Sequence, residues 1–271
     1  MSLYREKYEQ VTGRTAPAEA DNLEQLFTKI ATGELLPPRG QQAVDVGLTA
    51  HSLNDPYENR PIYDYYHWVL ENIFNDQSVN ELSAKLIGMA FTCANIFQTD
   101  LPQPLTLNPW QISALRDYPL ATQRAVIVEN NGVFIWLAKL HPDWPLINQG
   151  GNDFNDAYVA LIQSLEARHV QFTYLGDLDS QGIKIADNLF RKLKRTTIQR
   201  FTALQSPTNV SKWLSTLGKV NPKRTQFLTI HNPVLREELD SIHLFGVFVE
   251  QEQLIAEYER LIAEWLGDGE Q

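Results

Sequence analysis

The stretch QFTYLGDLDSQGIKI, from Gln171 to Ile185, decides the fold of this chain. It begins with a short β-prone run, breaks at Gly176, and continues with Asp177 and Asp179 as a D-x-D pair. Apolar residues then recur at helical spacing, at positions 183, 185, 186, 189, 190 and 193. The order strand, acidic turn, helix is typical of parallel α/β sheets, in which ligands bind at the carboxyl ends of the strands. The acidic turn is therefore a candidate site.

The two aspartates of this turn have two interpretations. When both are ionised they repel each other, and a divalent cation removes that cost. Ligand sets made only of oxygen favour Mg²⁺ or Mn²⁺ over Zn²⁺. In the alternative, the aspartates are solvated and cap the helix that follows. An isolated D-x-D pair favours this second interpretation.

Two upstream segments repeat the pattern of strand, turn and helix. Ala125–Val128 (AVIV) ends in Glu129 and is followed by an apolar pattern over residues 133–140. Pro145–Asn148 (PLIN) leads into a glycine-containing turn and a helical pattern over residues 157–165. Three such units in series imply a parallel sheet with right-handed crossovers. In that sheet Glu129 and the D-x-D pair lie on one rim.

These segments together resemble the Toprim domain of topoisomerases, primases and several nucleases, in which a glutamate follows the first strand and D-x-D follows the third. VENNGVF, LINQGGNDF and YLGDLDSQGIKIADNL resemble, in order and distance, the C-terminal half of a bacterial Toprim family encoded beside SMC-type ATPases in Wadjet-type plasmid-defence systems. The family pattern is E-N-P, then G-Q-P-S, then G-D-F-D-x-x-G. Here Asn131 replaces the first proline, and Gly151, Asn152 and Asp153 replace the Q-P-S turn.

The resemblance implies a Mg²⁺- or Mn²⁺-dependent nuclease that cleaves DNA phosphodiester bonds as a subunit of a defence complex against plasmids or phage. It assigns Asp177 and Asp179 to the metal, and Glu129 to the metal or to general acid/base work. Glu250, in a segment GVFVEQEQL that resembles the family's closing element, is either a further ligand or a solvated acid in the first turn of a helix. The implied partners are DNA and SMC-type ATPase subunits, with a homodimer as the form that could cut both strands.

Other functions remain open. The acidic charge and the changed turns at Asn131 and Asn152 are compatible with a Toprim-fold scaffold or regulatory subunit of an SMC-type complex that does no chemistry. A small-molecule α/β enzyme has little support, because the sequence contains no G-x-G-x-x-G, P-loop or G-x-S-x-G motif. A histidine-based metal site has little support either, since the histidines form no H-E-x-x-H pair.

The chain has 271 residues and a formal net charge of −10. This charge argues against a protein that coats DNA unaided, because neutralised phosphates supply most non-specific affinity. A basic face follows the acidic turn, and it either binds nucleic acid or is a solvated helix face with cations near its C-terminus. Its residues are Lys184, Arg191, Lys192, Lys194 and Arg195.

The sequence predicts an α/β protein: a mainly helical N-terminal region over residues 1–105, and a Toprim-like parallel sheet flanked by helices over 106–271. Leu101–Leu107 (LPQPLTL) is the expected linker. Apolar stripes predict helices within 1–36, 61–75, 81–97, 207–217, 233–240 and 251–266, and further strands at 200–204, 226–229 and 246–249. The sequence has no apolar run of about 18 residues and no signal-peptide pattern, so a cytoplasmic protein without a membrane segment is expected.

Overall fold

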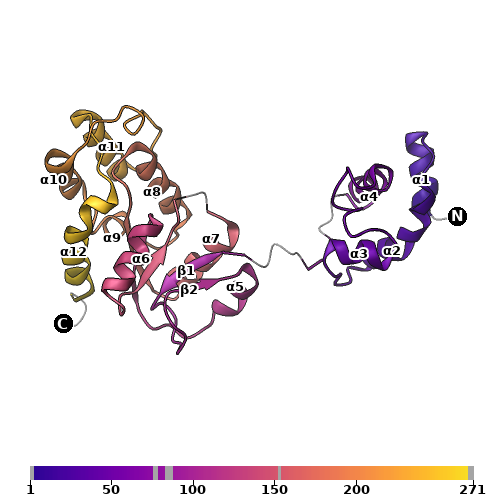
Figure 1. The fold of residues 1–271 in the computed structure, drawn as a ribbon, viewed down its shortest axis with the longest axis horizontal. Helices are drawn as coiled ribbons and strands as arrows, with labels where there is room; N and C mark the ends of the chain where they lie inside the picture. Colours follow the sequence, from indigo (N-terminus) through magenta and orange to yellow (C-terminus); the bar gives the residue numbers. More distant parts are fainter. Residues whose placement is uncertain (1–2, 76–78, 83–87, 152–153, 268–271) are drawn as a thin grey trace. The chain divides into compact units, whose positions relative to one another are not determined.

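The computed structural model describes residues 3–75, 79–82, 88–151 and 154–267 (Figure 1). Its internal contacts divide the chain into unit 1, Met1–Leu86, and unit 2, Ile87–Gln271. This division falls earlier than the boundary expected between residues 105 and 106. The reason is that β1 (Phe91–Ala94) and β2 (Leu105–Leu107) pair with each other inside the sheet of unit 2, so the expected linker segment contains a strand.

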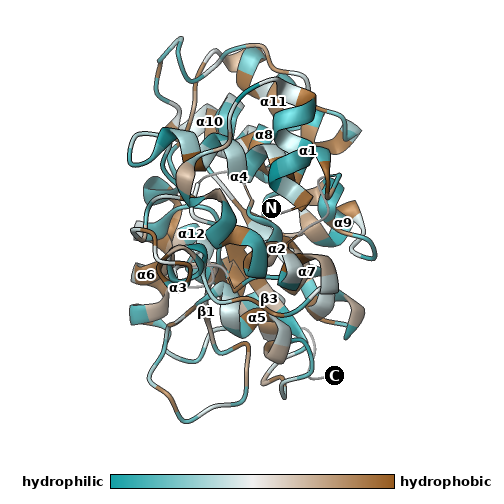
Figure 2. Cartoon of the chain, turned by 90° about the vertical axis from the view of Figure 1, so that its right-hand side faces the viewer, coloured by the Kyte–Doolittle hydropathy of each residue, from teal (hydrophilic) through white to brown (hydrophobic). Residues whose placement is uncertain are grey.

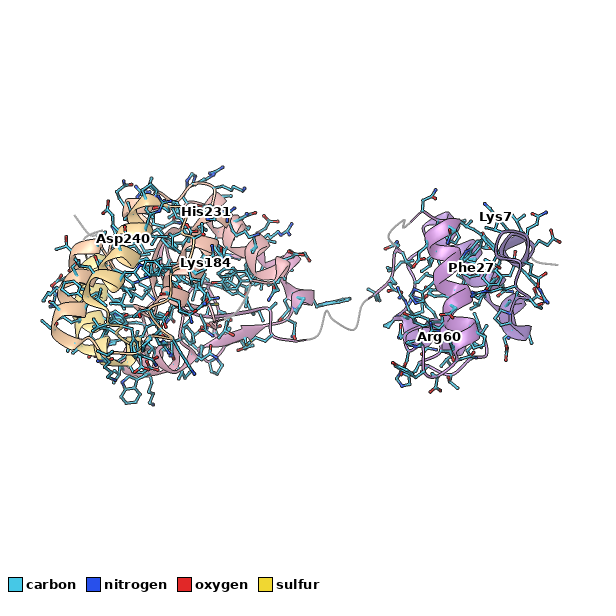
Figure 3. All side chains as sticks on the ribbon, turned by 90° about the horizontal axis from the view of Figure 1, so that it is seen from above. Lys7, Phe27, Arg60, Lys184, His231 and Asp240 are labelled. Carbon is cyan, nitrogen blue, oxygen red and sulfur yellow. The ribbon has the colours of Figure 1, made fainter. Side chains whose placement is uncertain are left out.

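Unit 1 is helical, as the sequence predicts. Asn59 caps its longest helix by accepting the backbone N–H of Ile62. The tyrosine-rich face of that helix is core: Tyr65 and Tyr66 are fully buried, and the Tyr66 ring stacks on Phe27 (labelled in Figure 3) with centroids 6.0 Å apart. The elements are α1 (Leu3–Thr12), η1 (Ala18–Leu23), α2 (Glu24–Thr32), α3 (Arg39–Asp45) and α4 (Arg60–Asn72).

The described part of unit 2 forms a five-stranded mixed sheet in the order β2-β1-β4-β3-β5. β3 (Arg124–Val128), β4 (Leu146–Asn148) and β5 (Gln171–Leu175) run parallel, and β1 runs antiparallel to both β2 and β4. The three parallel strands are those that the sequence predicts. Their near-continuous apolar runs are explained by burial on both faces of the sheet.

A helix follows each parallel strand, and helices flank the sheet (Figure 1). Each of these three helices begins with a side chain that accepts backbone N–H groups of the first turn: Asn130, Asn155 and Asp179. The caps fix where each loop turns away from its strand. The helices are α6 (Asn131–Leu140), α7 (Asp156–Ala167) and α8 (Ser180–Lys192).

The helix expected over Glu81–Phe97 is wrong where the structure describes it. Residues 91–94 form β1, and residues 83–87 lie outside the described part of the chain. A short apolar run fits a buried strand or a buried helix equally well. Residues 91–94 adopt the strand because they pair with β2 on one side and with β4 on the other. Cys93 is buried within it, as expected of a small apolar side chain.

The three further strands are also wrong. Residues 198–201 form a short helix, α9 (Ile198–Phe201), which begins at the capping residue Thr197. Phe201 stacks on Tyr174 with ring centroids 5.2 Å apart, so this segment covers β5 instead of extending the sheet. Residues 226–229 form no strand, and residues 246–249 form only two bridges, from Phe248 to Lys219 and from Val249 to Leu178.

The remaining helices agree with the sequence pattern. Asn108 and Gln111 form a capping box at the start of α5 (Pro109–Leu115), whose first residue is a proline. Figure 2 shows hydrophobic and hydrophilic residues alternating around the helices, as expected where one face packs on a core. No helix in the described ranges is both long and apolar enough to span a membrane. These helices are α5 (Pro109–Leu115), α10 (Pro207–Leu217), α11 (Pro233–Phe245), η3 (Gln251–Leu254) and α12 (Ile255–Gly267).

Candidate metal centre

The carboxyl ends of β3 and β5 bring Glu129 and the D-x-D turn into contact. Val128 and Leu175, the last residues of the two strands, are paired in the parallel register. Glu129 continues this pairing, because its N–H donates to the carbonyl of Leu175 at 3.0 Å. The N–H of Asp177 in turn donates to Glu129 Oε2 at 3.2 Å. The two residues that the sequence places on one rim are therefore joined directly.

Glu129 is buried in an environment that disfavours its charge. It is 7% exposed, and the hydroxyl of Tyr174 donates to its Oε2 at 3.0 Å. Burial and the neighbouring charge of Asp177 raise its pKa to about 7, against the opposing effect of the hydrogen bonds from Tyr174 and the Asp177 N–H. Near neutral pH this carboxyl is divided between its protonated and ionised forms, which suits a group that exchanges protons.

Gly176 permits this close packing. A Cβ at this position would lie 2.5 Å from Glu129 Oε2 and 2.8 Å from Tyr174 Cε1, so any side chain would displace one of them. The N–H of Gly176 donates to the buried side chain of Gln205 at 2.9 Å, which fixes the turn from behind.

The two aspartates are held by different partners. Asp179 Oδ1 accepts the N–H of Gly182 at 2.7 Å, so Asp179 does cap α8, but it is buried and not solvated as the second interpretation expected. Asp177 Oδ1 accepts the N–H of Gln251 at 2.9 Å. Burial raises the pKa of Asp177 despite that hydrogen bond, and the charge of Asp179 adds to the effect. Negative charge is therefore crowded at this turn.

Arg224 lies between the two aspartates and was not predicted from the sequence. Its Nη2 is 3.0 Å from Asp177 Oδ2, and its Nε contacts Asp179 Oδ2. The guanidinium also lies over the ring of Phe248, 4.8 Å from the centroid. Arg224 belongs to a turn far along the chain from the D-x-D pair. The sequence around it contains no motif that would distinguish this arginine from other cations in polar turns.

The structure separates the two glutamates of the closing segment. Glu250 Oε2 lies 3.2 Å from Lys219 Nζ, which gives this acid a cation of its own. Glu252 Oε1 instead accepts from Asn130 Nδ2 at 2.8 Å, beside Glu129, and its charge contributes to the raised pKa of Asp177. Of the two, Glu252 is the one electrostatically coupled to the rim.

Gln251 is a second residue that the sequence did not identify. It is fully buried, its N–H donates to Asp177, and its Oε1 accepts the N–H of Asn130 at 2.9 Å. It therefore ties the loop after β3 to the D-x-D turn. The segment GVFVEQEQL was identified from the sequence, but the residues predicted to be functional there were the acids on either side of Gln251.

The departures from the Toprim pattern fall on neighbouring loops. Asn131, in place of the first proline, accepts a hydrogen bond from Asn148 Nδ2 at 2.7 Å and so links the loops after β3 and β4. Gly151 has a left-handed backbone with φ of 69°, which glycine adopts without strain. Asn152 and Asp153 lie outside the described residues.

Within the described ranges, no three His, Cys, Asp or Glu side chains converge to hold a metal ion as they stand. At the rim, Arg224 contacts one oxygen of each aspartate. The donor set nevertheless fits Mg²⁺ or Mn²⁺, since it consists of carboxylate oxygens. Burial raises the pKa values of Glu129 and Asp177, and the neighbouring carboxylates add to this effect even though Arg224 is present.

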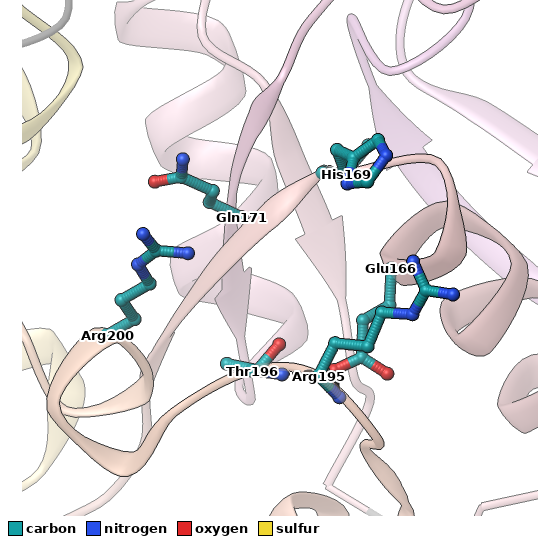
Figure 4. Close-up of a pocket in the computed structure, with 7 residues that line it drawn as sticks. Glu166, His169, Gln171, Arg195, Thr196 and Arg200 are labelled. Carbon is teal, nitrogen blue, oxygen red and sulfur yellow. Dashed lines mark hydrogen bonds between the residues drawn. The ribbon is translucent and has the colours of Figure 1, made fainter.

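The basic residues do not join the acids. Backbone N–H groups of residues 194–196 donate to Glu166, next to the start of β5 (Figure 4 shows Glu166, Arg195 and Thr196). The acids lie at the other end of this strand. α8 has 13 residues, so its two ends are about 20 Å apart. Lys184 donates to the carbonyl of Thr229 at 2.7 Å. The exposed cations are Arg191, Lys192, Lys194 and Arg195.

Comparison with the curated proteins finds no match. A family model described as "Protein of unknown function C-terminus (DUF2399)" matches residues 105–262, which is more than half of the chain. The matched region runs from β2 into α12 and includes Glu129, the D-x-D pair and Arg224. The chain therefore belongs to the DUF2399 family.

Proposed function

We propose that this protein is a Mg²⁺- or Mn²⁺-dependent nuclease of Toprim type that cleaves DNA phosphodiester bonds. The observation that carries the proposal is the direct contact between Glu129 and the D-x-D turn, at the carboxyl ends of the parallel strands β3 and β5. A glutamate after the first parallel strand and D-x-D after the third is the arrangement of the Toprim pattern. The raised pKa values at this rim support a site built for a cation.

Asp177 and Asp179 would hold the metal, with Glu129 as a further ligand or as the general acid/base. Bound divalent ions supply an activated water and stabilise the leaving oxygen in phosphodiester cleavage. Glu129, with a pKa of about 7, can take up or give a proton near neutral pH. The Tyr174 hydroxyl keeps the Glu129 carboxyl turned toward the D-x-D turn.

The proposal includes partners. The sequence resemblance supports a subunit of an anti-plasmid or anti-phage complex that contains SMC-type ATPase subunits, and a homodimer would supply one site for each DNA strand. The net charge of −10 supports dependence on such partners for DNA affinity. DNA that meets both the acidic rim and the exposed cations at 191–195 would have to run along α8.

A catalytically inactive Toprim-fold scaffold or regulatory subunit is the second candidate, and Arg224 is the observation that favours it. The guanidinium already pairs with both aspartates, so the turn has a cation without a metal. The two candidates differ in whether the rim binds a divalent cation and cleaves DNA.

The test is plasmid cleavage by the full chain with Mg²⁺ or Mn²⁺, alone and with its partner subunits. Glu129→Gln and Asp177→Asn should each lower the rate at least about 100-fold, because each removes a carboxylate from the reacting site. The matched control is Glu237→Gln, which neutralises an exposed acid on α11. Full activity of Asp177→Asn would exclude this site. Absence of both cleavage and Mn²⁺ binding would favour the inactive scaffold.

A further inference from the structure

The backbone of Arg224 is fixed independently of its ion pairs. Its carbonyl accepts the N–H of Ser180, the first residue of α8, at 2.9 Å. Its own N–H donates to the carbonyl of Asn221 at 2.9 Å, which closes the turn. The guanidinium can therefore leave the aspartates by side-chain rotation alone, while the turn stays in place.

The segment that follows Arg224 is hydrogen-bonded to side chains of α8. Lys184 Nζ donates to the carbonyl of Thr229 at 2.7 Å. Asp187, fully buried in the same helix, accepts the N–H groups of His231 and Asn232, each at 3.0 Å (Figure 3 marks Lys184 and His231). These contacts, from successive turns of α8, hold the segment beside the D-x-D turn. The Arg224 side chain itself is 32% exposed and so has an open side to move into.

In both aspartates the two carboxylate oxygens have the same two kinds of partner. The Oδ1 atoms accept backbone N–H groups, of Gln251 for Asp177 and of Gly182 for Asp179. The Oδ2 atoms face Arg224. A cation bound to the D-x-D pair would use these same Oδ2 atoms. A guanidinium and a divalent ion held there together would repel each other strongly at contact distance.

We propose that the Arg224 guanidinium and a divalent cation compete for Asp177 and Asp179, so that Arg224 closes the rim to metal until its side chain swings away. The proposal rests on the metal site of the proposed function, but it concerns metal binding and not cleavage. Charge favours the exchange, because the two aspartates share one guanidinium while Glu129 contacts the backbone of Asp177 and Glu252 contacts the neighbouring Asn130. Arg224 is thus a positioning residue that controls when the site can be loaded.

The test is Mn²⁺ titration of the full chain by calorimetry, with Arg224→Gln as the variant and Lys223→Gln as the matched control. Lys223 is the exposed neighbour, so its replacement removes the same charge without touching the aspartates. Arg224→Gln should bind Mn²⁺ at least about tenfold more tightly than the wild type, because the competing charge at contact distance is gone. Lys223→Gln should stay within about threefold, since solvent and salt screen its charge.

Thermal unfolding gives a second readout. Without metal, Arg224→Gln should unfold at a lower temperature than the wild type, because the two aspartates lose their shared cation. Mn²⁺ should then raise the unfolding temperature of the variant more than that of the wild type, in line with its tighter binding. If Arg224→Gln does not fold, Arg224→Met, which also removes the charge but keeps a long flexible side chain, should bind Mn²⁺ with an affinity above that of the wild type.

Equal or weaker Mn²⁺ binding by the folded Arg224 variants would overturn the competition. Absence of Mn²⁺ binding by every protein would overturn both the competition and the metal site. Tighter binding by Arg224→Gln without any DNA cleavage would support the competition and contradict the nuclease proposal. The two proposals can therefore fail separately.

Discussion

Two buried carboxylates lie at opposite ends of strand β5, and the protein treats them differently. Glu166 is 3% exposed and accepts the N–H groups of Lys194, Arg195 and Thr196 at 2.6, 2.7 and 2.5 Å (Figure 4). Burial alone would raise the pKa of Glu166, but these donors more than offset it and the pKa is lowered. Glu129, which is similarly buried, has a pKa raised to about 7.

Part of the difference comes from the groups around each carboxylate. Three successive backbone N–H groups of the turn after α8 donate to the Glu166 carboxylate, so its negative charge is stabilised by the fold itself. Glu129 has one hydroxyl and one N–H, and the carboxylates of Asp177 and Asp179 add to its unfavourable field. A buried acid that the fold leaves in such surroundings is one that a ligand can stabilise.

The largest expected effect on stability is at the satisfied carboxylate. Glu166→Gln should lower the free energy of unfolding by about 4 kcal/mol, because the neutral amide loses charge-assisted hydrogen bonds and turns an NH₂ group toward backbone donors. Glu129→Gln should show no such loss at neutral pH. Urea denaturation of both variants measures the contrast, and equal losses would break the comparison.

Local pattern was enough for much of this picture. The strands at 125–128, 145–148 and 171–175 and the helices that follow them could be predicted, because apolar periodicity and capping residues are properties of neighbouring positions. The meeting of Glu129 with the D-x-D turn followed from the rule that parallel strands end on one edge. Short apolar runs misled at residues 91–94 and 198–201, where pairing and packing with distant segments decided between strand and helix.

The rest of the site depends on contacts that no local pattern encodes. Arg224, Gln251 and Tyr174 reach the rim from three different segments. Glu166 is on an ordinary amphipathic helix in the sequence, and only the fold reveals that the basic segment closes around its carboxylate. The exposed cations of that segment were predicted as a face following the acids, yet they lie at the far end of α8.

The pH dependence of stability should have opposite signs for the two carboxylates. Glu129 has a folded pKa of about 7 above an ordinary value of 4.5, so its contribution is full below pH 4.5 and is lost as the pH rises toward 7. Relative to Glu129→Gln, the wild type should therefore lose about 3 kcal/mol across that window. Glu166 has a lowered pKa, so its contribution is present above pH 4.5 and is lost as the pH falls through the folded pKa.

Urea denaturation of the wild type and of the two glutamine variants, without divalent metal, at a series of pH values from about 3 to about 8, measures both slopes. The wild type should lose stability relative to Glu129→Gln as the pH rises, and gain stability relative to Glu166→Gln. Two slopes of the same sign would mean that Glu129 is as well satisfied as Glu166, and the argument for a ligand at the rim would lose its electrostatic basis.

The smallest expected effect concerns the cations around Glu166. Lys192 and Lys194 are exposed, about the length of α8 from the acids, and either they touch DNA phosphates or they are solvated cations near a helix C-terminus. If they bind DNA, Lys192→Gln and Lys194→Gln should each weaken DNA binding a few-fold and reduce the slope of log affinity against log salt by about 1. Lys139→Gln, at an exposed site on α6, is the control. An unchanged slope in both variants would leave this end of β5 a purely structural counterpart to the rim, with all recognition of DNA at the acids or in a partner subunit.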